Sequence, residues 1–178
     1  MSKIFVVSII SAITLLIGLS LFQHQIPNPK STPVSTPTTP NTSTKQIITE
    51  MRLQISYPHE FSFRKEIGDN YGQLRTAAFY IEKGNQNKPD YQLYGLFLAD
   101  KTSSQKDLER SKSEMDKTTT KEITLAGYAG IEGLILGPKT HYVTLIIKDN
   151  KLYSFSTYPP TTENKVLTDQ ILKTISFK

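Results

Sequence analysis

HYVTLIIKDNKLYSFSTY, residues 141–158, is the stretch that decides the fold. Two apolar runs flank Asp149-Asn150, and these two residues favour a tight turn because Asp and Asn tolerate the left-handed backbone that such turns need. With this turn, the facing pairs are Ile147 with Leu152, Ile146 with Tyr153, and Thr144 with Phe155. Both faces of this hairpin are apolar, which predicts that it lies at the centre of a sheet covered on both sides.

Composition narrows the class of protein. The chain has 178 residues, no Cys and a formal charge of +5. The lack of Cys excludes disulfides, thiolate zinc sites and cysteine nucleophiles. Residues 1–45 carry three lysines and no acid, so residues 46–178 hold the other 18 basic residues and all 16 acidic ones. Such a balanced charge argues against nucleic-acid binding.

The N-terminal segment, residues 1–26, reads as a membrane anchor or a signal segment. Ile4 to Phe22 is a run of 19 residues without a charge. At 1.5 Å per residue it would span roughly 28 Å, about the thickness of the hydrocarbon core. Lys3 before the run favours a cytoplasmic N-terminus. A signal peptide cleaved after the small residues Gly18 and Ser20 is the alternative, and both interpretations export the rest of the chain.

A spacer follows at residues 27–45, PNPKSTPVSTPTTPNTSTK. Five of the ten prolines lie here, together with six Thr and three Ser. Proline fixes φ and removes a backbone donor, so this segment is predicted to be an extended, disordered linker. Asn41-Thr42-Ser43 fits a glycosylation acceptor, but the favoured interpretation is a chance match within a Ser/Thr-rich tract.

Residues 46–178 are predicted to form one α+β domain. Before the hairpin, alternating or apolar runs predict strands at 52–57, 61–63, 74–82, 91–99, 123–125 and 129–136. Residues 102–117 predict an amphipathic helix with Leu108, Ser111 and Met115 on one face. Thr161 is expected to cap a second helix, before a last short strand that contains Ile175 and Phe177. Hairpin connections dominate, so the sheet should be mostly antiparallel and flanked by helices.

Glycines cluster at Gly127, Gly130, Gly133 and Gly137. A phosphate-binding loop would need these glycines to lead into the N-terminus of a helix. Here the residues that follow them are typical of a strand. The glycines are therefore predicted to mark bulges and tight turns.

Three quoted segments resemble the PsbP-like domain family: ISYPHEFSFRK, ITLAGYAGIEG and YVTLIIKDNKLYSFSTYPP. The resemblance covers about residues 50–178. It implies an α/β/α sandwich around an antiparallel sheet. It also implies a non-enzymatic accessory role, which in photosynthetic organisms is exercised at photosystem II. No residue of this chain matches a functional site of the family.

No motif for catalysis or metal binding stands out. His24, His59 and His141 lack metal-ligand spacing. His59 beside Glu60 is expected to face solvent, and His141 is expected to oppose Tyr158 as a surface pair. The acids of the predicted helix alternate with Lys and Arg, which is typical of a solvated face; they are Asp107, Glu109, Glu114 and Asp116.

Tyrosines are the remaining candidates for a binding surface. Tyr71, Tyr80, Tyr91, Tyr94 and Tyr128 either line a surface for a partner or ligand or simply follow the preference of Tyr for strands. The sequence does not decide between these two interpretations.

The sequence therefore predicts a membrane-tethered, extracytoplasmic, non-enzymatic binding or assembly-accessory domain. The alternative is a cell-envelope hydrolase whose dispersed acids meet in the fold. No residue is assigned a catalytic, cofactor-binding or metal-binding role, and no cofactor is expected. The expected partners are the membrane, through Ile4 to Phe22, and a protein or small ligand, but not nucleic acid.

Overall fold

The computed structural model describes residues 42–68, 75–85 and 87–178. In these residues the chain forms ten strands, two α-helices and one short 3-10 helix, Thr49–Met51. The strands before the first helix are β1 Ser43–Ile48, β2 Leu53–Pro58, β3 Ser62–Gly68, β4 Thr76–Asn85 and β5 Lys88–Leu98. After helix α1, Gln105–Glu114, come β6 Lys121–Leu125, β7 Tyr128–Ile135, β8 His141–Lys148 and β9 Lys151–Tyr158. Helix α2, Thr162–Leu172, and strand β10, Ser176–Phe177, complete the chain.

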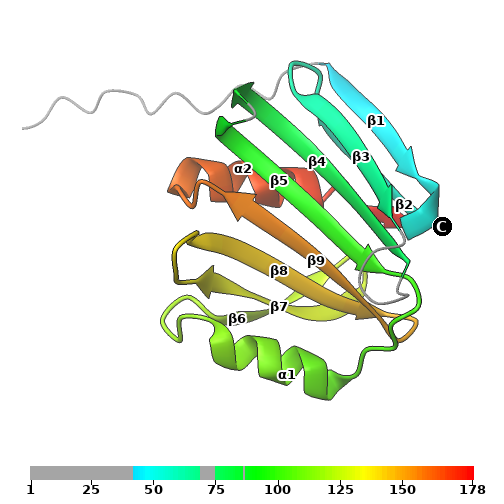
Figure 1. The fold of residues 1–178 in the computed structure, drawn as a ribbon, viewed down its shortest axis with the longest axis vertical. Helices are drawn as coiled ribbons and strands as arrows, with labels where there is room; N and C mark the ends of the chain where they lie inside the picture. Colours follow the sequence, from blue (N-terminus) through cyan, green and yellow to red (C-terminus); the bar gives the residue numbers. More distant parts are fainter. Residues whose placement is uncertain (1–41, 69–74, 86) are drawn as a thin grey trace, which may run out of the picture. The chain divides into compact units, whose positions relative to one another are not determined.

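The strands form two separate antiparallel sheets. The larger has the order β3-β4-β5-β9-β8-β7-β6, and the smaller has the order β1-β2-β10. Figure 1 shows α2 behind β4 and β5, whereas no helix crosses β3, β4 and β5 in front. We call the side that carries α2 and the small sheet the inner face of the large sheet, and the opposite side the outer face.

The central hairpin has the predicted register. Ile147 pairs with Leu152, and Thr144 pairs with Phe155. Asp149 and Asn150 have φ values of 49° and 57°, the left-handed conformation that the turn requires. On the inner face, Ile146 and Phe155 are fully buried. On the outer face, Val143 and Leu145 pack in one cluster with Leu108 of α1 and with Met115, which follows α1. The prediction that both faces of this hairpin are covered is therefore confirmed for β8 at Val143 and Leu145, but the outer face of β9 is only partly covered.

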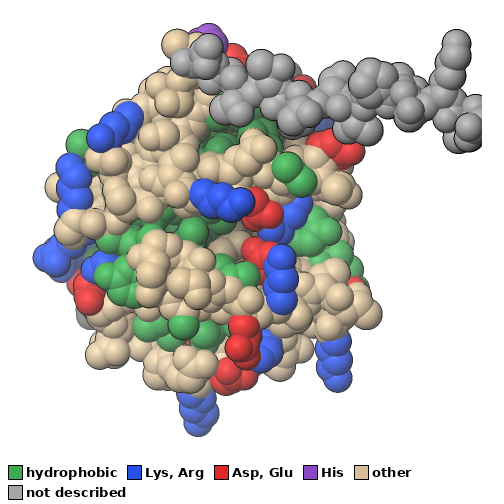
Figure 2. Space-filling view, turned by 180° about the vertical axis from the view of Figure 1, so that it is seen from behind, with side chains coloured by type: hydrophobic (Ala, Val, Ile, Leu, Met, Phe, Trp, Pro, Cys, Tyr) green, Lys and Arg blue, Asp and Glu red, His purple; other side chains and the backbone are tan. Residues whose placement is uncertain are grey.

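The main core lies between the inner face and the layer formed by α2 and the small sheet. Its fully buried members include Ile55 of β2, Phe79 of β4 and Leu93 of β5. Helix α2 begins where the sequence predicts, because the Thr161 side chain accepts a hydrogen bond from the backbone N–H of Asn164 at 3.2 Å. Figure 2, seen from behind, shows basic and acidic side chains interspersed on this side of the molecule.

The expected fold class, a single sheet flanked by helices in a PsbP-like α/β/α sandwich, is wrong. A second sheet covers the inner face together with α2, and α1 covers the outer face only at β7 and β8. The difference begins at β1, which includes Ser43 to Lys45 of the predicted linker. These polar residues form a strand because every second residue faces solvent while the backbone pairs with β2.

The first helix is also shorter than predicted. It begins after Ser104, whose side chain and that of Asp107 form a reciprocal capping box, and it ends at Glu114. Leu108 and Met115 are buried as expected. Most of the predicted linker and the hydrophobic run Ile4 to Phe22 lie outside the described residues. Within the described part of the chain, neither helix has the length and apolar character needed to cross a bilayer.

Candidate functional site: a tyrosine pocket on the open sheet face

The outer face of β3, β4, β5 and β9 carries a regular array of polar and aromatic side chains. Strand register builds it, because residues directly opposite each other on adjacent strands point to the same side of a sheet. The first row across the strands consists of Arg64, Tyr80, Tyr94 and Ser156. The second row consists of Ser62, Glu82, Gln92 and Tyr158, and His141 of β8 follows beside Tyr158.

A hollow of about 300 Å³ lies over these two rows. We call it the tyrosine pocket; its lining residues are Tyr80, Gln92, Tyr94, Lys139, His141, Ser156 and Tyr158. Six of the seven come from strands, so the rigid sheet positions them. Only Lys139 comes from the β7–β8 connection. The lining thus combines three phenol rings with amide, imidazole, hydroxyl and ammonium groups.

Aromatic contacts fix one end of the pocket. The rings of Tyr80 and Tyr94 lie 4.8 Å apart between centroids, tilted by 35°. The Arg64 guanidinium lies 3.7 Å from the centre of the Tyr80 ring and forms an ion pair with Glu66. Partial burial raises the pKa of Tyr80, and the charge of Glu66 raises it further. The Tyr80 hydroxyl therefore stays protonated at neutral pH and donates to Glu66 at 3.4 Å.

Buried Glu82 orients the amide in the middle of the pocket. Glu82 is only 4% exposed, and its carboxylate accepts a hydrogen bond of 2.6 Å from Gln92 Nε2. The same oxygen faces Arg64 Nη2 at 3.8 Å. Because Nε2 is held by Glu82, the carbonyl oxygen Oε1 of Gln92 is the end of the amide that remains to accept a donor.

His141 is oriented in a similar way at the other end. Its Nδ1 lies 2.8 Å from the carbonyl oxygen of Lys139. A carbonyl oxygen only accepts, so Nδ1 carries the hydrogen, and in the neutral ring Nε2 is then an acceptor. The Lys139 ammonium lies 4.9 Å from the centre of the Tyr158 ring. The predicted neighbours His141 and Tyr158 therefore line one pocket.

A second charged cluster lies on the inner face, around Glu132 of β7. Glu132 Oε1 is 2.7 Å from Lys121 Nζ, and Glu132 Oε2 is 3.1 Å from Lys165 Nζ of α2. Lys165 Nζ also contacts Asp169 at 2.5 Å. Burial raises the pKa of Glu132, but the hydrogen bonds and charges of the two lysines outweigh burial, and the net pKa is lowered. Glu132 is thus an ionised structural carboxylate rather than a proton donor at neutral pH.

The two buried carboxylates among the described residues, Glu82 and Glu132, do not meet. Glu82 lies on the outer face beside Gln92, whereas Glu132 lies on the inner face beside Lys165 of α2. The large sheet separates them, so they cannot flank one scissile bond. Two acids of the predicted helix serve local structure: Asp107 caps α1, and Asp116, which follows α1, accepts hydrogen bonds from Thr118. In the described parts of the chain, no cluster of three or more acidic or histidine side chains could hold a metal ion.

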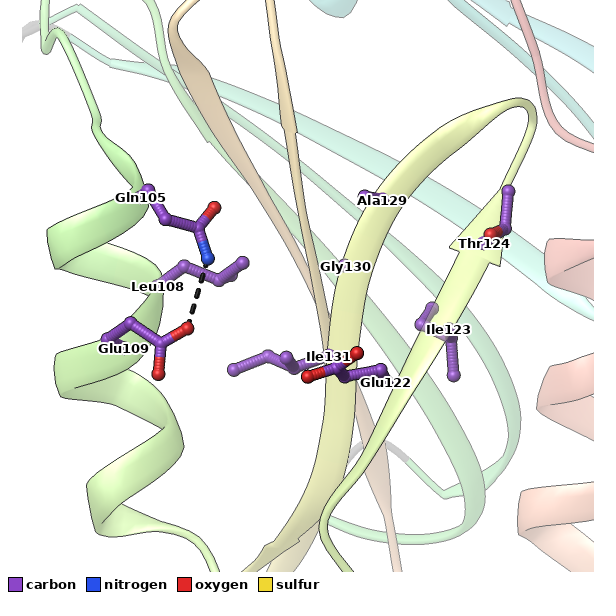
Figure 3. Close-up of a pocket in the computed structure, with 9 residues that line it drawn as sticks. All are labelled: Gln105, Leu108, Glu109, Glu122, Ile123, Thr124, Ala129, Gly130 and Ile131. Atoms are coloured by element: carbon purple, nitrogen blue, oxygen red, sulfur yellow. Dashed lines mark hydrogen bonds between the residues drawn. The ribbon is translucent and has the colours of Figure 1, made fainter.

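A larger hollow, about 410 Å³, lies between α1 and the β6–β7 hairpin (Figure 3). Leu108 and Ile131 point toward each other across it. Gln105 and Glu109 satisfy one another through a hydrogen bond of 3.0 Å along the helix. The polar side chains Gln105 and Glu109 of this groove are therefore already hydrogen-bonded to each other. The smaller tyrosine pocket, in contrast, contains the oriented acceptors of Gln92 and His141. Volume alone does not identify the binding site.

The structure separates the tyrosines that the sequence grouped together. Tyr80 and Tyr94 line the pocket, but Tyr91 is buried in the core and Tyr128 packs against Phe177 on the inner side. Tyr71 and His24 lie outside the described residues. His59 lies in an exposed turn beside Glu60, 3.5 Å from its carboxylate, as expected.

Sequence reasoning missed Gln92, Ser156 and Lys139. Period-two alternation places Gln92 and Tyr94 on one face of β5, but it does not show that β9 lies beside β5. The glycine segment behaves as predicted only in part: Gly127 occupies a turn with φ of +86°, but Gly130 and Gly133 pair in regular register within β7 and mark no bulge. The chain matches no model of a protein family, no curated protein and no solved structure.

Proposed function

We propose that residues 42–178 form a non-enzymatic binding domain and that the tyrosine pocket holds its ligand. One observation carries this proposal: rigid strands bring three tyrosines and two oriented acceptors, Gln92 and His141, around one hollow. Aromatic rings with a few fixed polar groups are the usual lining of small-molecule sites. A buried carboxylate, Glu82, is used to orient a neighbouring side chain, which is the support that a preorganised binding site needs.

We further propose that residues 4–22 tether the domain and that residues 27–41 hold it away from the membrane, on its extracytoplasmic side. The alternative of a cleaved signal peptide leads to the same compartment. A reporter that is active only outside the cytoplasm, fused after Lys178, should be active. Activity only from a cytoplasmic reporter would refute this topology.

The binding proposal can be tested with the full chain. Small-molecule extracts of the expressing cell's envelope are added to the wild-type protein and to the Tyr94→Ala variant, and thermal unfolding is measured. A ligand at 100 times its dissociation constant stabilises the native state by about 2.7 kcal/mol, so a fraction that contains the ligand should raise Tm of the wild type by several degrees.

The control is Ile67→Ala, at a residue that is 60% exposed and does not line the pocket. The Ile67→Ala variant should respond like the wild type, and the Tyr94→Ala variant should respond weakly or not at all. Fractions that stabilise all three proteins equally would show that the ligand binds elsewhere.

A further inference from the structure

We propose that the ligand of the tyrosine pocket is a neutral oligosaccharide. This inference rests on the proposed function, because it names the chemical class that the same pocket would bind. It follows from four properties of the lining: its aromatic surface, the polarity of its hydrogen-bonding groups, its charge balance and its place in the sheet.

The aromatic surface suits a sugar ring. A pyranose carries C–H groups on its faces and hydroxyls around its rim. The C–H groups pack favourably on the electron-rich faces of aromatic rings. Tyr80 and Tyr94 form a continuous aromatic surface with centroids 4.8 Å apart, and Tyr158 also lines the pocket.

The oriented polar groups call for a ligand that donates. Gln92 Nε2 is held by Glu82 at 2.6 Å, so the amide presents its carbonyl oxygen. His141 Nδ1 donates to the Lys139 carbonyl oxygen at 2.8 Å, so the neutral ring presents Nε2 as an acceptor. Hydroxyl groups can supply these donors and also accept from the Lys139 ammonium. A polyhydroxyl ligand satisfies both requirements.

The charge balance argues against an anionic polymer. Two cations, Arg64 and Lys139, and two carboxylates, Glu66 and Glu82, surround the aromatic rows. Arg64 is already paired with Glu66 and faces Glu82 at 3.8 Å. Binding a nucleic acid would need several uncompensated Lys or Arg side chains along the path of the phosphates. Among the described residues that line the pocket, Lys139 is the one Lys or Arg side chain.

The position of the pocket argues against an extended peptide. A peptide that adds to a sheet uses the backbone groups of an edge strand. The pocket lies over β4, β5, β9 and β8, and each of these strands has a neighbour on both sides. A ligand in this pocket can therefore be bound only by side chains. This suits a sugar, whose hydroxyl groups lie around the rim of its ring.

The test uses the full 178-residue chain on an array of neutral glycans, followed by calorimetric titration of the best-bound soluble oligosaccharide. A deoxythymidine hexanucleotide and a serine-rich hexapeptide are titrated in parallel. The variants are Tyr94→Ala, which removes an aromatic face, and Gln92→Met, which removes the acceptor at similar volume; Ile67→Ala is the control. Circular dichroism and thermal unfolding verify that each variant is folded.

We expect a neutral oligosaccharide to bind, Tyr94→Ala and Gln92→Met each to weaken its binding at least tenfold, and Ile67→Ala to change it less than twofold. Binding of the hexanucleotide or the peptide to this pocket, with no glycan bound, would overturn the saccharide assignment but leave the pocket as the binding site. Glycan binding that neither pocket variant weakens would overturn the pocket as the saccharide site. No binding of any probe, together with equal stabilisation of all variants by envelope extracts, would overturn both proposals.

Discussion

Replacing Gly95 with Ala should destabilise the domain strongly, because Phe79 occupies the space that a methyl group would need. A Cβ on Gly95 would meet three ring atoms of Phe79 closer than 3.0 Å, with Cδ1, the farthest of the three, at 2.7 Å. Ordinary contact begins near 3.4 Å. The Phe79 ring is fully buried, with Phe63 at 6.2 Å and Phe155 at 6.4 Å between centroids, so it cannot move away into solvent.

The expected loss is about 3 kcal/mol, the upper part of the range for overpacked cores. For a domain of this size the loss corresponds to a Tm lowered by roughly 10 °C. Urea unfolding followed by circular dichroism measures the free energy directly. Gly133→Ala is the matched control, since it makes the same change within a strand but has as its closest contact the Met115 Sδ of a flexible side chain at 2.8 Å, with Met115 Cβ and Thr120 Oγ1 at 3.1 Å. It should cost about 1 kcal/mol.

A second substitution tests the cause. Phe79→Leu removes the ring that blocks the new methyl group, so the double variant Gly95→Ala/Phe79→Leu should be more stable than the sum of the two single losses predicts, by about 1 kcal/mol or more. Additive losses, or a Gly95→Ala variant as stable as Gly133→Ala, would refute the claim that Phe79 is clamped against Gly95.

Two further predictions concern buried polar groups. Glu132→Gln should cost about 2 kcal/mol at pH 7, because it removes the charge of a carboxylate that contacts Lys121 and Lys165. The native pKa of Glu132 is lowered below its ordinary value of 4.5, so its stabilisation is complete above about pH 4.5 and is lost as the pH falls through the native pKa. In urea unfolding between pH 3 and 7, the difference between wild type and variant should shrink below pH 4.5; a constant difference would contradict this. Tyr91→Phe should cost about 1 kcal/mol. It removes the buried hydroxyl that lies 3.0 Å from Thr168 Oγ1, but Thr168 keeps its 2.8 Å bond to Thr157. A loss above 3 kcal/mol in the same assay would show that the three hydroxyls act as one unit.

The sequence was sufficient wherever local chemistry sets the structure. Asp149-Asn150 accept positive φ values, and this turn alone determines the register of β8 and β9. Thr161 caps α2 because its hydroxyl can reach the N–H of Asn164, three residues further along the chain. Both features depend on neighbours in sequence, which pattern reasoning can see.

The layers could not be predicted in the same way. The three strands of the small sheet come from opposite ends of the domain: Phe177 of β10 pairs with Leu53 of β2, more than a hundred residues away. No local signal specifies this pairing. The polar residues at the start of β1 were also predicted to belong to the linker, because a strand that is exposed on one face contains few apolar residues.

The pocket was only half visible in the sequence. Tyr80 and Tyr94 stood among the tyrosine candidates, and His141 was expected beside Tyr158. The pairing of Tyr94 with Ser156 between β5 and β9 joins these two halves, across more than sixty residues of sequence. Long-range strand order, rather than residue type, therefore determines which tyrosines become a surface and which, like Tyr91, become core.

The most direct test of the binding site is a map of amide chemical shifts. The isotope-labelled full chain is titrated with the active envelope fraction, and two-dimensional NMR spectra record which backbone signals move. The tyrosine pocket predicts that the largest changes fall on Gln92, Tyr94, His141 and Ser156, and that the signals of the α1 groove, such as Gln105, stay in place. Shifts concentrated at α1 or on the small sheet, with the pocket signals unmoved, would contradict the assignment of the ligand to this pocket.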